Sequence, residues 1–223
     1  VKAGDTGNDV TQKGETTYGD TDTIITNQNK DIASSNTVTI ETNDKNDKVE
    51  VTLKDVNIDT SSRNKAAVSV TGEGDTNIKL NGDNALKSDI YRSGIYGSGS
   101  GSLTISGGEN DSLTAQGGSG ANGISSSGSL TISGGTVTAT GGNSTDSVGS
   151  GGSGIYSVSG DVTISGGTVN ANGGDGKNGS GGGSGIDSSG GVTVSGGTVT
   201  ANGGDSKDGS GGSGISSFNR VAI

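Results

Sequence analysis

The chain has 223 residues, a net charge of −10, and no Cys, His or Pro. The acidic balance disfavours nucleic acid and anionic membranes as partners, and no apolar run suggests membrane insertion. Without Cys or His there is no disulfide framework and no Ser/His or Cys/His catalytic pair. Only 25% of the residues are hydrophobic, which is common in disordered chains, but here they fall in a strict register that favours an ordered fold.

Residues 1–48 are more charged and poorer in Gly than the remainder, and they are only partly periodic. They predict an irregular N-terminal segment that enters or caps the fold, with residues 23–25 and 38–40 as entry strands and residues 1–22 as a looser stretch. A single repetitive body is expected from residue 49 to residue 223.

Nearly the same 14-residue segment occurs three times, beginning at Ser129, Asp161 and Gly191. A fixed period of about 30 residues is the signature of a solenoid, in which each repeat is one structural unit stacked on the next. Any surface chemistry of such a body is repetitive, because each exposed residue belongs to a ladder of equivalent residues.

Each copy contains two segments in which apolar and polar residues alternate, such as residues 130–132 and 136–140. This alternation predicts strands with one buried face. Gly134 and Gly135 between them mark a corner, since Gly adopts the backbone conformations of a sharp bend. A third short strand, such as residues 155–157, precedes each pair.

The apolar positions of all copies align as columns that neighbouring coils bury. First-strand positions are Val68, Ile95, Ile124, Ile155, Ile186 and Ile215; second-strand pairs are Val51/Leu53, Ile78/Leu80, Leu103/Ile105, Leu130/Ile132, Val162/Ile164 and Val192/Val194; third-strand pairs are Val56/Ile58, Leu113/Ala115, Val137/Ala139, Val169/Ala171 and Val199/Ala201, with Ala85-Leu86 ambiguous.

These columns predict an all-β protein, a parallel β-helix with three short strands and a Gly/Ser-rich loop per coil. Six to eight coils are expected, with neighbouring coils ~4.8 Å apart. A right-handed solenoid is the expected hand, because parallel crossover connections strongly favour it.

The outward positions form polar ladders. One contains Thr104, Thr131, Thr163 and Thr193, another Thr136, Thr168 and Thr198, and a third Thr140, Asn172 and Asn202. Stacked Thr and Asn stiffen a sheet by hydrogen bonding along its axis. They also offer a flat array for an ordered ligand, either a polysaccharide or ice, although the Asn residues interrupt the Thr spacing that an ice-binding face needs.

Tyr96 and Tyr156 each follow a first-strand Ile, with Ser125 in the coil between them. They are expected in one column ~9.6 Å apart, which is two strand spacings and close to the length of a disaccharide. With the hydroxyls of Thr131 and Thr163 they are the candidate carbohydrate-binding residues. The alternative is that both tyrosines are ordinary surface residues.

The loops after the third strands carry aligned oxygen-bearing side chains. Asn143, Asp175 and Asp205 are expected in one column, and Asp146, Asn178 and Asp208 in a second. These are candidate Ca²⁺ ligands, since Ca²⁺ takes six to eight oxygens at flexible geometry. The alternative is that they cap turns through their own backbone, with Lys177 and Lys207 balancing their charge. No other cofactor is expected.

Catalysis is not expected, because the acidic residues lie mostly in turns and no isolated pair of carboxylates is evident. Only Arg63, Arg92 and Arg220 offer a guanidinium for β-elimination, so a polysaccharide lyase is a remote alternative.

The sequence ends within a repeat. Val221-Ala-Ile223 follows Ile215 at the spacing of a second strand, and Phe218 lies at the corner between them. An open coil end exposes unpaired backbone and apolar columns. Phe218, Val221 and Ile223 are therefore candidate assembly residues, and either the coils continue in a longer chain or this end stacks on another chain as in a fibre.

Residues 49–59, residues 76–86 and the Leu-Thr-Ile-Ser-Gly-Gly copies resemble the repeat region of Firmicutes surface proteins labelled carbohydrate-binding. Those proteins are similar to the clostridial cellulose- and pectin-binding parallel β-helix family. The resemblance covers roughly residues 20–223. It implies an extracellular, non-catalytic, Ca²⁺-assisted polysaccharide binder at the bacterial cell surface.

Two functional hypotheses follow. The first is a non-enzymatic extracellular structural or adhesive protein whose coils continue or stack end to end. The second is a polysaccharide-binding module that uses Tyr96 and Tyr156.

Overall fold

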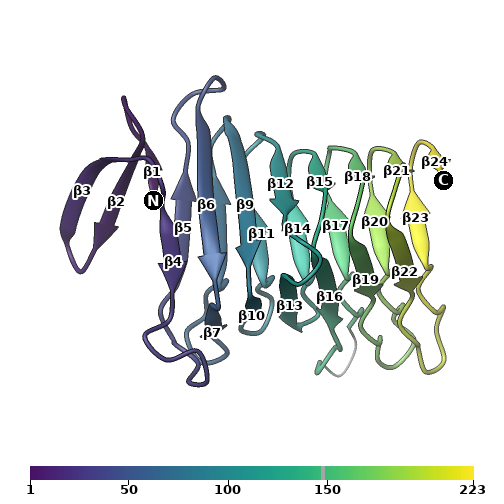
Figure 1. Cartoon of the computed structure of the whole chain (residues 1–223). Helices are drawn as coiled ribbons and strands as arrows, with labels where there is room; N and C mark the ends of the chain where they lie inside the picture. Colours follow the sequence, from purple (N-terminus) through teal and green to yellow (C-terminus); the bar gives the residue numbers. More distant parts are fainter. Residues whose placement is uncertain (147–148) are drawn as a thin grey trace.

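A computed structural model of the chain describes residues 1–146 and 149–223. In this part the chain is all-β, with strands β1 to β24 arranged in three long sheets, here called A, B and C. Successive strands from β5 onward visit the sheets in the order A, B, C, and each circuit is one turn of a parallel β-helix. About seven turns stack along one axis (Figure 1). The predicted fold class is therefore confirmed.

Sheet A contains ten strands and sheet B eight. In spatial order, sheet A contains β23 (Ile215–Ser217), β20 (Ile186–Ser188), β17 (Ile155–Ser157), β14 (Ile124–Ser126), β11 (Ile95–Gly97), β8 (Val68–Thr71), β5 (Val38–Glu41), β1 (Lys2–Ala3), β2 (Asn8–Gln12) and β3 (Glu15–Asp20). Sheet B contains β24 (Val221–Ala222), β21 (Val192–Val194), β18 (Val162–Ile164), β15 (Leu130–Ile132), β12 (Leu103–Ser106), β9 (Asp75–Asn81), β6 (Lys48–Lys54) and β4 (Ile24–Thr26).

Sheet C contains six strands. In spatial order they are β22 (Thr198–Asn202), β19 (Thr168–Asn172), β16 (Thr136–Gly142), β13 (Ser112–Ser119), β10 (Asp83–Lys87) and β7 (Asn57–Asp59). All pairings between successive turns are parallel, so the solenoid is uniform from β4 to β24.

The N-terminal segment is more regular than expected. Strands β4 and β5 pair in parallel with β6 and β8, so the solenoid begins at Ile24 rather than at residue 49. Residues 2–20 contain three strands and are not loose chain, because β1 pairs with β5 and with β2, and β2–β3 form an antiparallel hairpin. Figure 1 shows this hairpin at the end of the solenoid opposite the C-terminus.

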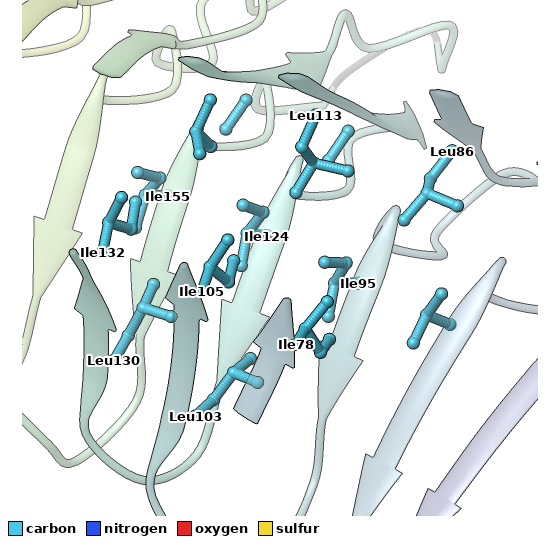
Figure 2. Close-up of a cluster of buried hydrophobic side chains, with 14 of the residues drawn as sticks. Ile78, Leu86, Ile95, Leu103, Ile105, Leu113, Ile124, Leu130, Ile132 and Ile155 are labelled. Atoms are coloured by element: carbon cyan, nitrogen blue, oxygen red, sulfur yellow. The ribbon is translucent and has the colours of Figure 1, made fainter. Parts of the chain in front are cut away.

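The core consists of the predicted aliphatic columns, with one correction: Ile78 lies beside Ile105 and not, as predicted, beside Leu103. The backbone pairing places the six first-strand residues in one unbroken column from Val68 to Ile215. In Figure 2, Ile95, Ile124 and Ile155 of sheet A point toward the side chains of sheet B, with Leu86 and Leu113 of sheet C beside them. The aliphatic side chains of each turn are therefore buried by those of the neighbouring turns. Burial of each large aliphatic side chain stabilises the fold by about 1.5–3 kcal/mol.

Two buried polar residues interrupt these columns. Ile105 lies beside Ile78, so the preceding residue of the column, Leu103, lies beside Thr76. Thr76 is 2% exposed and its Oγ1 has no hydrogen-bond partner. In the ambiguous Ala85-Leu86 segment Leu86 is the buried residue, so Asn84 enters the column of Leu113.

Asn84 differs from Thr76 because both the oxygen and the nitrogen of its side-chain amide form hydrogen bonds. Its Oδ1 accepts a hydrogen bond from the backbone N–H of Val56 at 2.9 Å, and its Nδ2 donates to the carbonyl oxygen of Ser112 at 3.2 Å. The side chain therefore joins three successive turns.

A ladder of inward-facing serines closes the corner between sheets A and B. Ser126, Ser157, Ser188 and Ser217 are consecutive rungs at the ends of their strands. The hydroxyl of Ser157 donates to the carbonyl oxygen of Gly160 at 2.7 Å, and the hydroxyl of Ser188 reaches the same carbonyl at 3.0 Å. These hydroxyls give turn carbonyls a hydrogen-bond partner, as most buried or partly buried carbonyls have.

The corner between sheets C and A is built from glycine backbone. We call Gly142, Gly152, Gly174, Gly183, Gly204 and Gly212 the glycine seam. Each N–H from Gly152 to Gly212 in this series donates to the carbonyl oxygen of the preceding member at 2.8 to 3.0 Å. The hydrogen bonds therefore cross back and forth between two segments and climb the axis turn by turn. Side chains are excluded because the two backbones are in contact: a Cβ on Gly183 would lie 2.0 Å from the carbonyl oxygen of Gly152.

Candidate functional site

The two tyrosines of the candidate carbohydrate site share one outward column of sheet A. Tyr96 pairs with Ser125, and Ser125 pairs with Tyr156, as the spacing predicted. Toward the N-terminus the same column continues through Ser69 to Thr39. Tyr96 is 47% exposed, whereas Ser125 is only 5% exposed although it faces outward.

Thr131 and Thr163 lie elsewhere. They are neighbouring rungs of an outward column in sheet B. The inner side chains of sheets A and B face each other across the core (Figure 2), so the outer side chains of the two sheets point away from each other. The structure therefore does not bring the two threonines together with Tyr96 and Tyr156, and the four residues are not one site.

Tyr96 instead lines a shallow groove of about 310 Å³ on the outer face of sheet A. The floor comes from the sheet itself, where Thr39, Ser69 and Tyr96 are three consecutive rungs. The lining residues are Thr37, Thr39, Asn64, Lys65, Ala66, Ser69, Arg92 and Tyr96. Its volume is at the lower end of the range for ligand pockets, about 300–1,000 Å³.

The rim of this groove, here called the Tyr96 groove, is cationic. Lys65 follows β7 in one corner loop, and Arg92 precedes β11 in the corner loop of the next turn. Arg92 Nε donates to Asn64 Oδ1 at 3.2 Å, which orients the guanidinium. Within residues 1–146 and 149–223, no carboxylate lies within ion-pair distance of Lys65 or Arg92.

The sequence pattern pointed to Tyr96 but not to its neighbours in the groove. Asn64, Lys65 and Arg92 lie in the two corner loops where the repeat is least regular, so no column predicts them. The available signal is compositional: the chain has only 14 Lys and Arg residues, and three of them (Arg63, Lys65 and Arg92) occur in these two loops.

A second groove, of about 500 Å³, runs along the corner between sheets B and C. It is lined by the glycines of three successive turns, by Glu109, and by Thr136 and Thr168. The two threonines are neighbouring rungs of sheet C, as predicted. This groove has neither an aromatic ring nor a cation, so it offers backbone and hydroxyl groups alone.

The predicted column of Asn143, Asp175 and Asp205 is present, and its oxygens bind backbone. Asn143 Oδ1 accepts the backbone N–H of Asp175, and Asp175 Oδ1 accepts that of Asp205, both at 2.8 Å. The side chains thus link successive loops, which is the turn-capping role that Asp and Asn often have. Within residues 1–146 and 149–223 no three His, Cys, Asp or Glu residues cluster as a metal site.

The second column is less uniform. Asn178 and Asp208 take equivalent left-handed backbone conformations, with φ of 49° and 65°. Asp146 is used differently, because its Oδ2 accepts the hydroxyl of Tyr91 at 2.5 Å. That hydrogen bond connects the corner loop before β11 to the loop after β16.

Tyr91 offers a spectroscopic test of this contact. The hydrogen bond to Asp146, with a smaller contribution from its charge, raises the pKa of Tyr91 above the ordinary value. Because ionised Tyr91 would face a carboxylate, Asp146→Ala is expected to lower the pH at which Tyr91 ionises. Alkaline titration of tyrosinate absorbance, with Tyr91→Phe to identify its step, measures the change. Asp208→Ala is the control, and a Tyr91 step that stays in place in Asp146→Ala contradicts the contact.

The three predicted assembly residues lie at the C-terminal end of the solenoid. Phe218 and Ile223 are 86% and 90% exposed and Val221 is 44% exposed. They accompany β22, β23 and β24, each of which is the last strand of its sheet and pairs on one side alone in this chain.

Comparison with known proteins agrees with this architecture. A family model described as a β-helix repeat matches residues 130–155, 162–190 and 192–215. Each matched segment starts at the sheet B strand of one turn, and two of the three end at the first residue of the next sheet A strand, Ile155 or Ile215. No curated protein and no solved structure gives a significant match. The chain is thus a parallel β-helix protein that is similar to β-helix repeat proteins over these three turns.

No helix that could cross a membrane occurs in residues 1–146 and 149–223.

Proposed function

We propose that this chain is a non-catalytic structural or adhesive scaffold of the bacterial cell surface. The observation that carries the proposal is the uniformity of the solenoid: its polar ladders of Thr, Ser and Asn repeat from turn to turn in unbroken register. Such a body generates length and a regular surface, as solenoid repeats do. The resemblance to Firmicutes surface proteins supports the extracellular location.

The hydrogen bonds that the carboxylates accept from the backbone support a non-catalytic role. General acid–base chemistry needs carboxyl groups that face a substrate. Here Asp175 binds the backbone of the next turn, and Asp111 accepts N–H groups from Gly82 and Gly108, each at 2.8 Å. These acids join turns to one another.

We further propose that the scaffold extends from its C-terminal edge. Strands β22, β23 and β24 present unpaired backbone groups and the exposed apolar side chains of Phe218, Val221 and Ile223, a combination that promotes pairing. At the other end, the hairpin β2–β3 lies beyond the first turn in sheet A. These features support a role of this edge in pairing with a second copy of the chain.

The test is the association of the 223-residue chain in solution. We expect sedimentation velocity to show association that increases with concentration, and Val221→Lys to abolish it because a charge on an edge strand blocks pairing. Val158→Lys is the matched control, since Val158 is also 44% exposed but lies away from this edge. A wild-type chain that stays monomeric at every concentration contradicts pairing with a second copy.

Polysaccharide binding is the second candidate, and the Tyr96 groove is the observation that favours it. An aromatic ring beside a row of hydroxyls suits a sugar, which stacks one face on the ring and hydrogen-bonds through its edges. Retention on a panel of plant and microbial polysaccharides, with and without Ca²⁺, tests this function. Tyr96→Ser is expected to abolish retention and Tyr156→Ser to weaken it less, because Tyr156 does not line the groove. Lack of retention on every polysaccharide removes this candidate.

A further inference from the structure

We propose that the rim of the Tyr96 groove is a binding site for the phosphate group of a phosphomonoester. Lys65 and Arg92 line this rim together, and within residues 1–146 and 149–223 neither of them forms an ion pair. The inference goes beyond both proposed functions and depends on neither of them.

The two cations occupy comparable places in successive corner loops. Lys65 lies three residues before the first residue of β8, Arg92 lies three residues before the first residue of β11, and these two first residues pair with each other. Each cation directly follows a residue in the left-handed conformation, Asn64 with φ of 54° and Tyr91 with φ of 59°. The two loops are therefore stacked in register, and the two cations are close neighbours.

Two stacked cations without a counter-ion repel each other, as like charges on neighbouring strands do. Asp89 belongs to the same loop as Arg92, but its two oxygens accept the backbone N–H groups of Asn64 and Ile90 at 2.6 and 2.7 Å. Although the chain as a whole carries −10, the charged residues that line this groove are both cations. An anion from outside the chain would remove the repulsion.

The rim offers several hydrogen-bond donors to one anion. Arg92 Nε donates to Asn64 Oδ1 at 3.2 Å, which orients the guanidinium and leaves its terminal nitrogens for a ligand. The ammonium group of Lys65 supplies three further N–H donors. The amide nitrogen of Asn64 is a further donor beside them, because the amide oxygen is the atom that accepts from Arg92.

A phosphomonoester matches these donors better than a carboxylate does. It carries about −1.5 to −2 charges at neutral pH and has three terminal oxygens, so it can balance Arg92 and Lys65 at once. A carboxylate carries a single charge and is saturated by one guanidinium, which would leave Lys65 unpaired. A phosphodiester polymer such as nucleic acid is disfavoured, because the net negative charge of the chain repels it.

Tyr96 favours an ester over free phosphate. Its ring is 47% exposed and lines the same groove as the two cations. A group that is esterified to the bound phosphate would therefore lie against this ring, and burial of apolar surface there adds to the affinity.

The experiment compares phenyl phosphate with phenyl sulfate, which has a similar shape but a single charge. Isothermal titration calorimetry with the full chain, at constant ionic strength, is expected to show about tenfold tighter binding of phenyl phosphate. Lys65→Gln and Arg92→Gln are each expected to weaken binding of phenyl phosphate about tenfold and to abolish its advantage over phenyl sulfate. Lys79→Gln, which removes an exposed cation from sheet B, is the matched control and is expected to change neither affinity.

Urea denaturation without ligand separates loss of binding from loss of folding. Lys65→Gln is expected to be at least as stable as the wild type, because it removes the repulsion between the two cations. A Lys65→Gln chain that is less stable than the wild type overturns the inference, since the ammonium group then has a stabilising partner within the protein.

The binding data can overturn the inference in four further ways. Absence of binding removes the site, and equal affinities for phenyl phosphate and phenyl sulfate remove the preference for a dianion. Equal weakening by Lys79→Gln and Arg92→Gln shows an effect of net charge alone. Inorganic phosphate that binds as tightly as phenyl phosphate identifies free phosphate as the ligand and excludes the ester.

Discussion

Gly183→Ala is expected to destabilise the protein by about 3 kcal/mol, at the upper end of the usual cost of overpacking, whereas Gly181→Ala is expected to be nearly neutral. A Cβ on Gly183 would lie 2.0 Å from the carbonyl oxygen of Gly152, and that oxygen is fixed by its hydrogen bond to the N–H of Gly174. A Cβ on Gly181 meets its nearest atom at 3.5 Å, an ordinary contact. Neither residue has a positive φ, so the pair isolates close approach from backbone strain.

Urea denaturation followed by far-ultraviolet circular dichroism measures both variants. The glycine seam is continuous, so hydrogen exchange is expected to quicken in Gly183→Ala at the amides of Gly174 and Gly204, which lie on either side of the substitution. An equal loss of stability in Gly181→Ala contradicts the role of close backbone contact in the seam. It would mean that replacing any glycine of these loops destabilises the protein by restricting the backbone.

The glycine seam could not be predicted from the sequence. The Gly/Ser tracts predict loops between the strands of the repeat, and a flexible linker of the same composition would give the same prediction. What distinguishes the seam is the contact between backbones from different turns, such as Gly152 with Gly174. The local sequence does not reveal such a contact, since these two glycines lie in the same kind of Gly/Ser-rich tract as exposed glycines such as Gly179.

The aliphatic columns were predictable because two independent periods agree on them. The alternation of period two selects the inward residues of a strand, and the repeat of about 30 residues aligns equivalent strands, so Ile95, Ile124 and Ile155 were placed correctly. Register is weaker where the strands lengthen: β6 and β9 contain seven residues each, and the predicted alignment of Leu103 with Ile78 was wrong by two residues. In the structure Leu103 lies beside Thr76, and Ile105 lies beside Ile78.

The residues of the candidate site also fall into a group that the repeat predicts and a group that it does not. Tyr96 and Tyr156 share a column because they occupy equivalent positions of the repeat. Lys65 and Arg92 come from corner loops outside the repeat, and which side chains such loops bring together depends on how the chain crosses from sheet C to sheet A. The grouping of Thr131 and Thr163 with the tyrosines failed because a coil has several outward faces, and the alternation does not say which outward residues share one.

The two polar interruptions of the core predict opposite effects on stability. Asn84→Ala is expected to destabilise the protein by about 3 kcal/mol, since it leaves the buried N–H of Val56 without a partner, at about 1–3 kcal/mol, and removes packed volume. Thr76→Val is expected to stabilise it by about 1 kcal/mol, because Val has the same shape and removes the hydroxyl that has no hydrogen bond. The same urea titration measures both changes.

Asn84→Leu separates volume from hydrogen bonding. Leucine matches Leu113 in the same column and restores the apolar volume, but it cannot accept the N–H of Val56, so this variant is expected to remain less stable than the wild type and to show faster exchange at the Val56 amide. If Asn84→Leu is as stable as the wild type, the amide is dispensable and the column tolerates any residue of suitable size. If Thr76→Val is destabilising, its hydroxyl has a partner, and the register at Leu103 must then differ from the one described. The sign of each substitution therefore tests the register of the turns on which the Tyr96 groove is built.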